Sequence, residues 1–249
     1  DLLPPDGNGV SDVYVVTRPA TTVLRVSRSL AGGDSDGPSW AGGISADGRW
    51  ITFASAATNL VAGDAAGHVD VFLRDRLAAT CTRVSNGVLG AEPNGDAGGA
   101  TRALRPAMAP SGSLVVYPST ATNLVTPATN GQLNLFASDR VTGATSLVTI
   151  GQGGAAANGP SRWPTVADVG PLVAFESDAS NLVASDGNGM TDVFVRDLAT
   201  GITTRISVAT GGAAANGPSG KPSVSADGRF VAFESAATNL VANDQNGVT

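Results

Sequence analysis

The sequence predicts an all-β fold built from tandem repeats, and three observations lead to this prediction. Charged residues make up only 14% of the 249 residues, whereas glycine occurs 32 times. This composition is typical of strands joined by many turns. Short apolar runs recur along the chain without the period of an amphipathic helix. The same segments also return about every 58 residues, which indicates a repeat architecture.

The repeat is defined by an Asn-Leu-Val segment, with Asp1-Leu2-Leu3 in the corresponding place at the start. The segment stands at residues 59–61, 123–125, 181–183 and 239–241. We therefore treat the chain as a single domain with repeat units at 1–58, 59–122, 123–180 and 181–238 and a partial unit at 239–249. The second unit is six residues longer, and its extra residues fall in the glycine-rich stretch between Gly95 and Arg105.

Each unit is expected to contain four short strands. An acidic loop comes first and leads into an apolar strand such as Val193-Phe194-Val195. A second strand follows, as at 203–208, and then a loop rich in alanine and glycine leads into a hairpin. The hairpin turn contains Asp-Gly, as at Asp47-Gly48 and Asp227-Gly228. This pair between two apolar runs is a strong hairpin signal.

The strands are nearly continuously apolar, so both faces of each sheet need to be covered. One four-stranded sheet cannot cover both of its own faces, but stacked identical sheets can. Four strands per repeat therefore predict a β-propeller whose blades are four-stranded antiparallel sheets. Two columns of large side chains are expected to pack between blades: Phe53, Tyr117, Phe175 and Phe233, and Trp50, Leu114, Leu172 and Phe230.

The two ends of the chain allow two interpretations. Residues 12–27 supply two strands and residues 222–234 supply two more, so together they could complete one blade and close a ring of four. Residues 239–249 nevertheless repeat residues 1–11, and a closed ring needs that loop only once. The surplus favours a slice of a longer array, such as a larger propeller, and both interpretations stay open.

The repeat resembles a known family of propellers. The run from Ser225 to Phe233 looks like the WD-type repeat of TolB-like propellers. The unit as a whole is similar to long tandem repeats in secreted bacterial propeller proteins, and the likeness covers essentially the entire chain. The resemblance implies blades of four antiparallel strands and a secreted, cell-surface or periplasmic location in a bacterium. It implies little about function, because such propellers serve as binding scaffolds in many settings.

The loop before the first strand of each unit carries the pattern Asp-x-Asn-Gly-x-x-Asp. The pattern is complete in the loops at Asp6 and Asp186, partial at Asp64, where Ala66 replaces the asparagine, and truncated at Asp244. It is lost in the third unit, where Ala128 and Asn134 replace the two aspartates. Oxygen ligands at this spacing in a tight loop can converge on Ca²⁺, which takes about six to eight of them. The loop resembles the calcium loops of integrin-type FG-GAP repeats, although it is shorter by one acidic position. The predicted Ca²⁺ ligands are Asp6, Asn8, Asp12, Asp64, Asp70, Asp186, Asn188, Asp192, Asp244 and Asn246.

A purely structural interpretation of these loops is equally open. Asp and Asn side chains form Asx-turns with their own backbone, and glycine supplies a positive φ. The last aspartate of each loop would then only cap the turn that precedes its strand.

The candidates for catalysis are few. The single histidine, His68, lies inside an acidic loop, and a Ser-His-Asp triad would have to use it. The glutamates Glu92, Glu176 and Glu234 do not single out the carboxylate pair that a glycosidase needs. Cys81 aligns with small strand residues, so it is expected to be structural.

Two other residue types stand out. Arg25, Arg83 and Arg205 share a column that Leu147 breaks, and they are expected to form ion pairs at strand ends, with Asp75 or Asp197. The tryptophans Trp40 and Trp163 are placed in connecting segments, where an exposed ring could stack on a sugar.

Charge and cysteine content narrow the functional classes. A net charge of −6 without a basic cluster disfavours nucleic-acid binding. No apolar run is long enough for membrane insertion, and one cysteine excludes an intrachain disulfide. We predict a non-catalytic secreted structural or binding module with calcium-stabilised loops. It would bind a protein or glycan partner on a propeller face and form part of a larger extracellular assembly. The alternatives are a lectin-like carbohydrate-binding propeller and a TolB-like periplasmic protein-binding propeller.

Overall fold

A computed structural model describes residues 6–19, 22–242 and 244, and its described strands form five antiparallel sheets. The first sheet consists of β1 (Tyr14–Val16) and β2 (Val23–Arg25). The second consists of β3 (Ser39–Ile44), β4 (Trp50–Ser55), β5 (Asp70–Asp75) and β6 (Thr80–Arg83). The third consists of β7 (Ala107–Met108), β8 (Leu114–Ser119), β9 (Asn134–Asp139) and β10 (Thr145–Leu147).

The fourth sheet consists of β11 (Ser161–Val166), β12 (Leu172–Ser177), β13 (Asp192–Asp197) and β14 (Thr203–Arg205), and the fifth of β15 (Ser219–Val224) and β16 (Val231–Ser235). Three single 3₁₀ turns interrupt the loops: η1 (Val88–Gly90), η2 (Arg102–Leu104) and η3 (Gln152–Gly154). The three four-stranded sheets confirm the predicted blade of four antiparallel strands.

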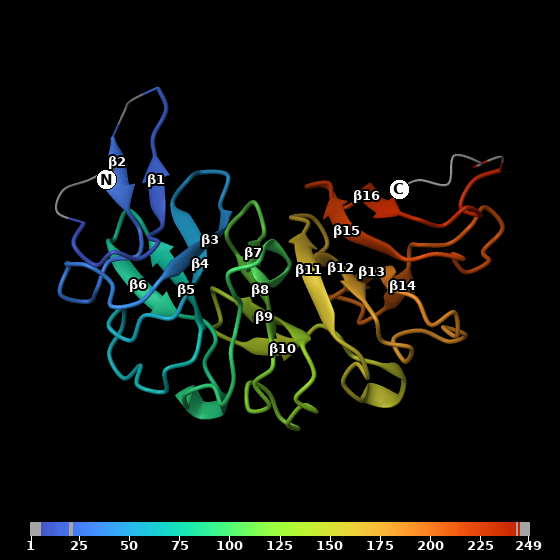
Figure 1. The fold of residues 1–249 in the computed structure, drawn as a ribbon, viewed down its shortest axis with the longest axis horizontal. Helices are drawn as coiled ribbons and strands as arrows, with labels where there is room; N and C mark the ends of the chain where they lie inside the picture. The colour runs from blue at the N-terminus through green and yellow to red at the C-terminus, as the bar shows by residue number, and fades with distance from the viewer. Residues whose placement is uncertain (1–5, 20–21, 243, 245–249) are drawn as a thin grey trace.

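The sheets follow one another in chain order along an arc (Figure 1). The strands β3, β7, β11 and β15 lie on the inner side of this arc, and β6, β10 and β14 lie on its outer side. β1 and β2 stand at one end, and β15 and β16 stand at the other. In the described part of the chain these two pairs remain separate two-stranded sheets, so the pairing that would close a ring of four blades is not formed.

Three members of the predicted aromatic column pack within and between the sheets, whereas the fourth, Phe233, is half-buried in β16. Phe53, Tyr117 and Phe175 have no exposed surface. Each stacks on an aromatic ring of the neighbouring strand in the same sheet, with ring centroids 5.5, 6.1 and 5.8 Å apart. Phe175 also packs with Leu135 and Val148 of the preceding sheet, which buries the facing surfaces of both sheets. Burial of such rings is the main favourable contribution to the stacking of blades.

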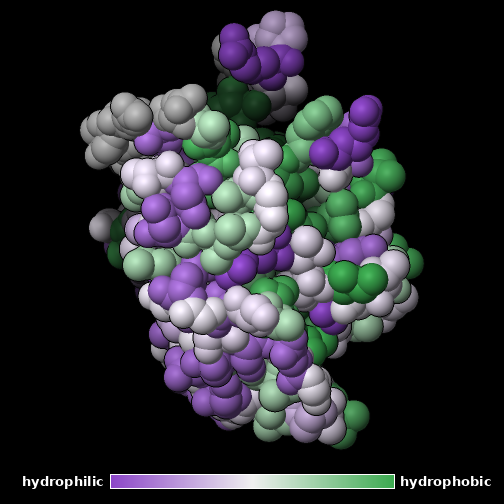
Figure 2. Space-filling view, turned by 90° about the vertical axis from the view of Figure 1, so that its right-hand side faces the viewer, coloured by the Kyte–Doolittle hydropathy of each residue, from purple (hydrophilic) through white to green (hydrophobic). Residues whose placement is uncertain are grey.

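The second predicted column is less buried. Trp50, Leu114 and Leu172 are half-buried at the starts of β4, β8 and β12, whereas Phe230 is 65% exposed just before β16. Figure 2 views the molecule from the side on which β15 and β16 lie, and polar and apolar residues are mixed across that face.

The Asp-Gly hairpin turns form as predicted. Gly48 and Gly228 adopt φ values of +70° and +71°, which glycine tolerates and other residues rarely do. In the first of these turns, the Ser45 hydroxyl donates to Asp47 over 2.5 Å and accepts the backbone N–H of Trp50. These bonds fix the reversal between β3 and β4.

The placement of Trp40 and Trp163 in connecting segments is wrong, because the two residues lie in the inner strands β3 and β11. These two strands are hard to recognise from the pattern of side chains in the sequence, and the reason is physical. Each contains a β-bulge, between Ala41 and Ile44 in β3 and between Arg162 and Thr165 in β11. A bulge breaks the alternation of side chains by which a strand is recognised.

Among the described residues, no helix has both the length and the apolar content required to cross a membrane.

Candidate functional site

The last aspartate of each acidic loop is a buried structural group. Asp70 and Asp192 have no exposed surface, nor has the side chain of Asp12. Each accepts a short hydrogen bond from a serine fifteen residues later, and that serine oxygen accepts the backbone N–H that follows the aspartate. The serines are Ser27, Ser85 and Ser207, with Oγ–Oδ1 distances of 2.5, 2.6 and 2.5 Å. This pair ties the start of one strand to the segment after the next strand.

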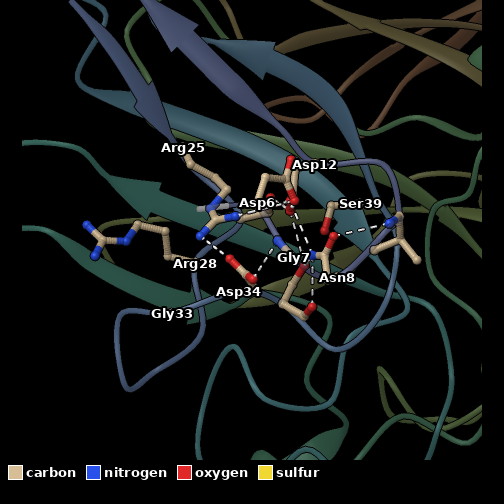
Figure 3. Close-up of polar contacts among 12 residues, drawn as sticks. Asp6, Gly7, Asn8, Asp12, Arg25, Arg28, Gly33, Asp34 and Ser39 are labelled. Atoms are coloured by element: carbon tan, nitrogen blue, oxygen red, sulfur yellow. Dashed lines mark hydrogen bonds and ion pairs between the residues drawn. The ribbon is translucent and has the colours of Figure 1, made fainter. Parts of the chain in front are cut away.

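An arginine from the neighbouring strand reaches the carboxylates of each of these loops. Arg205 lies 3.0 Å from Asp186 and 3.6 Å from Asp192. Arg25 likewise contacts Asp6, Asp12 and Asp34 (Figure 3), and Arg83 contacts Asp64, Asp70 and Glu92. The three arginine side chains are only 7–11% exposed. Because these pairs are largely removed from water, loss of one partner would leave an uncompensated buried charge. We call these clusters the Arg–Asp locks.

The expected pairing of these arginines with Asp75 or Asp197 is wrong. Asp75 binds Arg49 over 2.7 Å, and Asp197 accepts the backbone N–H groups of residues 199 and 200. The reason lies in the strand register. Phe72 of β5 is opposite Arg83 of β6, so the arginine lies near the start of β5, beside the acidic loop, rather than near its end.

The third acidic loop shows what happens where the charges are absent. Leu147 stands in the arginine column, and Asn134 replaces the last aspartate. Asn134 still accepts a hydrogen bond from Thr149, over 2.9 Å, so the neutral pair keeps the same connection. Arginine and aspartates are therefore lost together in one unit and kept together in the others. This covariation inside one chain is the sequence signal that identifies the locks.

The asparagine of each complete loop forms an Asx-turn, as expected if the loop is purely structural. Asn8 and Asn188 accept the backbone N–H of Val10 and Met190 through their carboxamide oxygens, over 3.1 Å in both loops. Their nitrogens instead donate toward the last aspartate, over 3.3 and 2.9 Å. One of the two lone pairs of each carboxamide oxygen is therefore engaged with the backbone.

The complete loops do not fit Ca²⁺ in this arrangement, because a guanidinium group and an amide nitrogen face their carboxylates. Among the residues that the structure describes, no group of three or more His, Cys, Asp or Glu side chains is arranged to hold a metal ion. Asp244 belongs to the partial loop, and its predicted co-ligand Asn246 lies outside the described residues. Calcium binding stays a prediction.

The loop at Asp64 differs from the complete loops. Asp64 and Asp70 each keep one buried carboxylate oxygen without a hydrogen-bond partner. Three carboxylates surround the single guanidinium of Arg83. The Arg25 lock also has three carboxylates around one guanidinium, so the difference at Arg83 is the pair of buried carboxylate oxygens without a hydrogen-bond partner. A proton or a cation would neutralise the excess negative charge there.

Burial has a direct electrostatic consequence in this lock. Desolvation raises the pKa of Asp70 from its ordinary value of 3.8 to about 6, against the opposing effects of Ser85 and Arg83. Desolvation also raises the pKa of Asp64 and of Asp186. Burial therefore stabilises the protonated, neutral form of these carboxyl groups in the folded protein.

The other candidate residues occupy separate places. His68 Nδ1 lies 3.5 Å from Asp96 at the surface. Burial raises the pKa of the Cys81 thiol to about 11, which leaves it unreactive. Glu92 belongs to the Arg83 lock, whereas Glu176 accepts from Arg162 over 2.9 Å and from the backbone N–H of residue 221 over 2.7 Å.

The inner strands enclose a cavity of about 640 Å³ on the concave side of the arc. Its lining includes Arg102, Arg105, Trp163, Lys221 and Glu234. We call it the inner channel. The strand registers give four different residues equivalent places in the four repeats: Ala41, Arg105, Trp163 and Lys221. Trp163 and Lys221 stand in the bulges of β11 and β15, whereas Ala41 is still paired with Phe53 and Arg105 precedes β7. The repeats therefore differ in chemistry at this position of the channel, although the next position is proline in three of the four units (Pro106, Pro164 and Pro222).

Between pH 4 and pH 7, we expect the free energy of unfolding to fall as Asp70 ionises in the folded state. The folded pKa is above the unfolded value, so this contribution is present below about pH 4 and is lost as the pH rises through about 6. A shift of this size corresponds to roughly 1–3 kcal/mol. Asp70→Asn, which copies Asn134 of the third loop, should remove that pH dependence in urea unfolding experiments. Asp227→Asn is the control, because hydrogen bonds lower the pKa of that exposed carboxyl below this window. An Asp70→Asn protein with the full wild-type pH dependence would contradict the assignment.

We also expect Arg205→Leu alone to cost about 3–5 kcal/mol of unfolding free energy, because two buried carboxylates lose their counter-charge. The triple change Asp186→Ala, Asp192→Asn and Arg205→Leu copies the residues of the third loop and should recover most of that loss. Exposed Arg28→Leu serves as the control for losing a cation. Equal destabilisation by the single and triple changes would show that the charges are not coupled.

Comparisons with known proteins identify the fold. No protein family and no curated protein matches the sequence. Among solved structures, TolB from Acinetobacter baumannii is similar with a TM-score of 0.51 and 14% identity over 92% of this chain. A putative TolB from Agrobacterium tumefaciens is similar with a TM-score of 0.53 and 14% identity over 90% of this chain. The chain spans 46% and 63% of the length of these two proteins. Together with its antiparallel four-stranded sheets, these similarities show that the chain has a TolB-like β-propeller fold.

Proposed function

We propose that this chain is a non-catalytic binding propeller, periplasmic or secreted, whose protein partner enters the inner channel. One observation carries the proposal: the repeats are alike where side chains hold the structure together and differ where they face the channel. The recurring polar residues are used inside the protein, in the Arg–Asp locks and in paired serine hydroxyls such as Ser161 and Ser177, which lie 2.8 Å apart. The TolB-like fold is compatible with a periplasmic protein-binding role.

The backbone supports a special role for the channel positions. Trp163 and Lys221 adopt φ values of +61° and +50°, a left-handed conformation that costs a non-glycine residue of the order of 1 kcal/mol or more. Strained residues of this kind concentrate at functional sites. Both residues stand at bulges of inner strands, which turn their side chains away from the regular ladder.

A protein partner is favoured over a carbohydrate because two of the three tryptophan rings, Trp50 and Trp163, are engaged with arginines. Trp50, in a larger cleft of about 830 Å³ that runs between β6 and β10, has guanidinium groups 4.7 and 4.2 Å from its ring centroid, from Arg49 and Arg140. Trp163 has Arg102 at 5.9 Å from its ring. Sugar stacking needs an open aromatic face, and these guanidinium groups occupy such faces.

In this proposal the loops are stiffened by the chain's own arginines. Calcium is kept as a proposal for the loop at Asp64, where the orphaned oxygens of Asp64 and Asp70 support it. Rigid loops and stacked sheets would present the channel to a partner without a large conformational cost.

The proposal predicts that peptide binding depends on the channel. Peptides selected from a displayed random library on the wild-type protein should lose binding to Ala41→Trp. This change fills the channel with the residue type that position 163 already carries in the equivalent place. Val141→Trp, at an exposed turn outside the channel, is the matched control and should bind normally. Circular dichroism would confirm that both variants fold. Selected peptides that bind both variants equally would overturn the proposed function.

A further inference from the structure

We propose that the inner channel recognises an acidic peptide segment, whose carboxylates pair with Arg102 and Arg105 beside Trp163. This inference rests on the proposed function and adds the chemistry of the partner. It begins with the longer second unit, whose extra residues fall between Gly95 and Arg105. That segment includes η2, which packs against β11. The insertion thereby brings Arg102 to the channel, next to Arg105, which occupies the position that Trp163 and Lys221 hold in the following units.

The two channel arginines differ from the arginines of the Arg–Asp locks and from Arg162. Arg25, Arg83, Arg162 and Arg205 each have a carboxylate within 4 Å. Within the described ranges, Arg102 and Arg105 have none. The Nε atom of Arg105 is buried without a hydrogen-bond partner, as are those of Arg196 and Arg205, so the missing carboxylate is what distinguishes Arg105 from the lock residue Arg205. A carboxylate that enters the cavity would give these guanidinium groups a strong charge-assisted bond.

The charge of the channel is opposite to that of the whole protein. Its lining carries the cations Arg102, Arg105 and Lys221 and the single carboxylate Glu234, which pairs with Lys221 over 2.6 Å. The chain as a whole has a net charge of −6. A cleft lined by one sign of charge concentrates ligands of the other sign, because its walls focus the electric field. The channel therefore favours an anion even on an acidic protein.

The shape of the channel and its backbone favour a peptide as the source of that anion. A cavity of about 640 Å³ lies within the range of sites that hold ligands of a few residues in size. Trp163 and Pro164 have no register partner in β12, because the bulge removes them from the ladder. An apolar ring beside two unpaired guanidinium groups suits a segment in which acidic residues flank an apolar side chain. An anionic oligosaccharide is the competing source, and it is treated as an outcome of the test.

The test measures binding of an acetylated and amidated hexaglutamate peptide by calorimetry. Arg102→Gln combined with Arg105→Gln should weaken the Kd at least tenfold. The control, Arg28→Gln combined with Arg229→Gln, removes the same charge from exposed arginines outside the channel lining and should leave the Kd within twofold. Trp163→Ala, which copies Ala41 at the equivalent position, should abolish any peptide-induced change in tryptophan fluorescence. A hexaglutamine peptide should not bind.

Three outcomes would overturn the inference. The hexaglutamate peptide could fail to bind, it could bind both double variants equally, or a uronic-acid hexasaccharide could bind more tightly and lose that binding in the channel variant. Library peptides that depend on the channel but not on Arg102 and Arg105 would remove only the acidic specificity and leave the proposed function standing. If no library peptide depends on the channel and hexaglutamate does not bind, both proposals fall.

Discussion

The structure depends on the neutralisation of a few buried carboxylates in a protein that has few charged residues. Asp12, Asp70 and Asp192 are buried at the starts of their strands, where an unpaired carboxylate would be costly. The chain meets this constraint with a serine hydroxyl from a later segment and an arginine from the adjacent strand. Each lock therefore joins a loop, a strand start and the segment after the next strand, and the position of that loop follows from the pairing of charges.

The Arg–Asp locks also explain why the repeats can differ without loss of the fold. Where Leu147 replaces the arginine, Asn134 replaces the aspartate, and the hydrogen bond to Thr149 preserves the connection. The locks lie along the loops, whereas the channel lies along the inner strands, so the two sets of residues can vary independently. The bulge position that holds Trp163 in one strand holds Lys221 in the next. In this view the residues shared by the repeats maintain the fold, and the channel residues that differ between repeats determine which partner is bound.

Much of the fold followed from short-range patterns in the sequence. Asp-Gly turns, the spacing of the apolar runs and the aromatic column at Phe53, Tyr117 and Phe175 depend on neighbours in the chain or on simple repetition. The carboxylate partners of Arg83 and Arg205 could not be predicted in this way. They are determined by the antiparallel register of the strands, and an alignment of the repeats gives no information about that register. The inner strands were missed in part because bulges interrupt their alternation.

The candidate site was harder to predict than the fold. The acidic pattern located the loops and the carboxylates that form the Arg–Asp locks in them. It could not show whether the positive partner is a metal ion or a side chain, since both satisfy the same pattern. The channel residue Arg102 comes from an insertion that matches no other unit, so the repeat offers no guide to its position. Arg105 does match Trp163 and Lys221 in the repeat, but the residue type at this position differs from unit to unit.

The central claim is that the complete loops carry their own cation in the form of arginine. Equilibrium dialysis with radioactive calcium tests it most directly, by counting bound ions in the wild-type chain and in Asp64→Asn and Asp186→Asn variants. We expect no more than one ion per wild-type chain and none in Asp64→Asn, with Asp186→Asn unchanged. Two or more bound ions, or binding that survives Asp64→Asn and disappears in Asp186→Asn, would contradict the account.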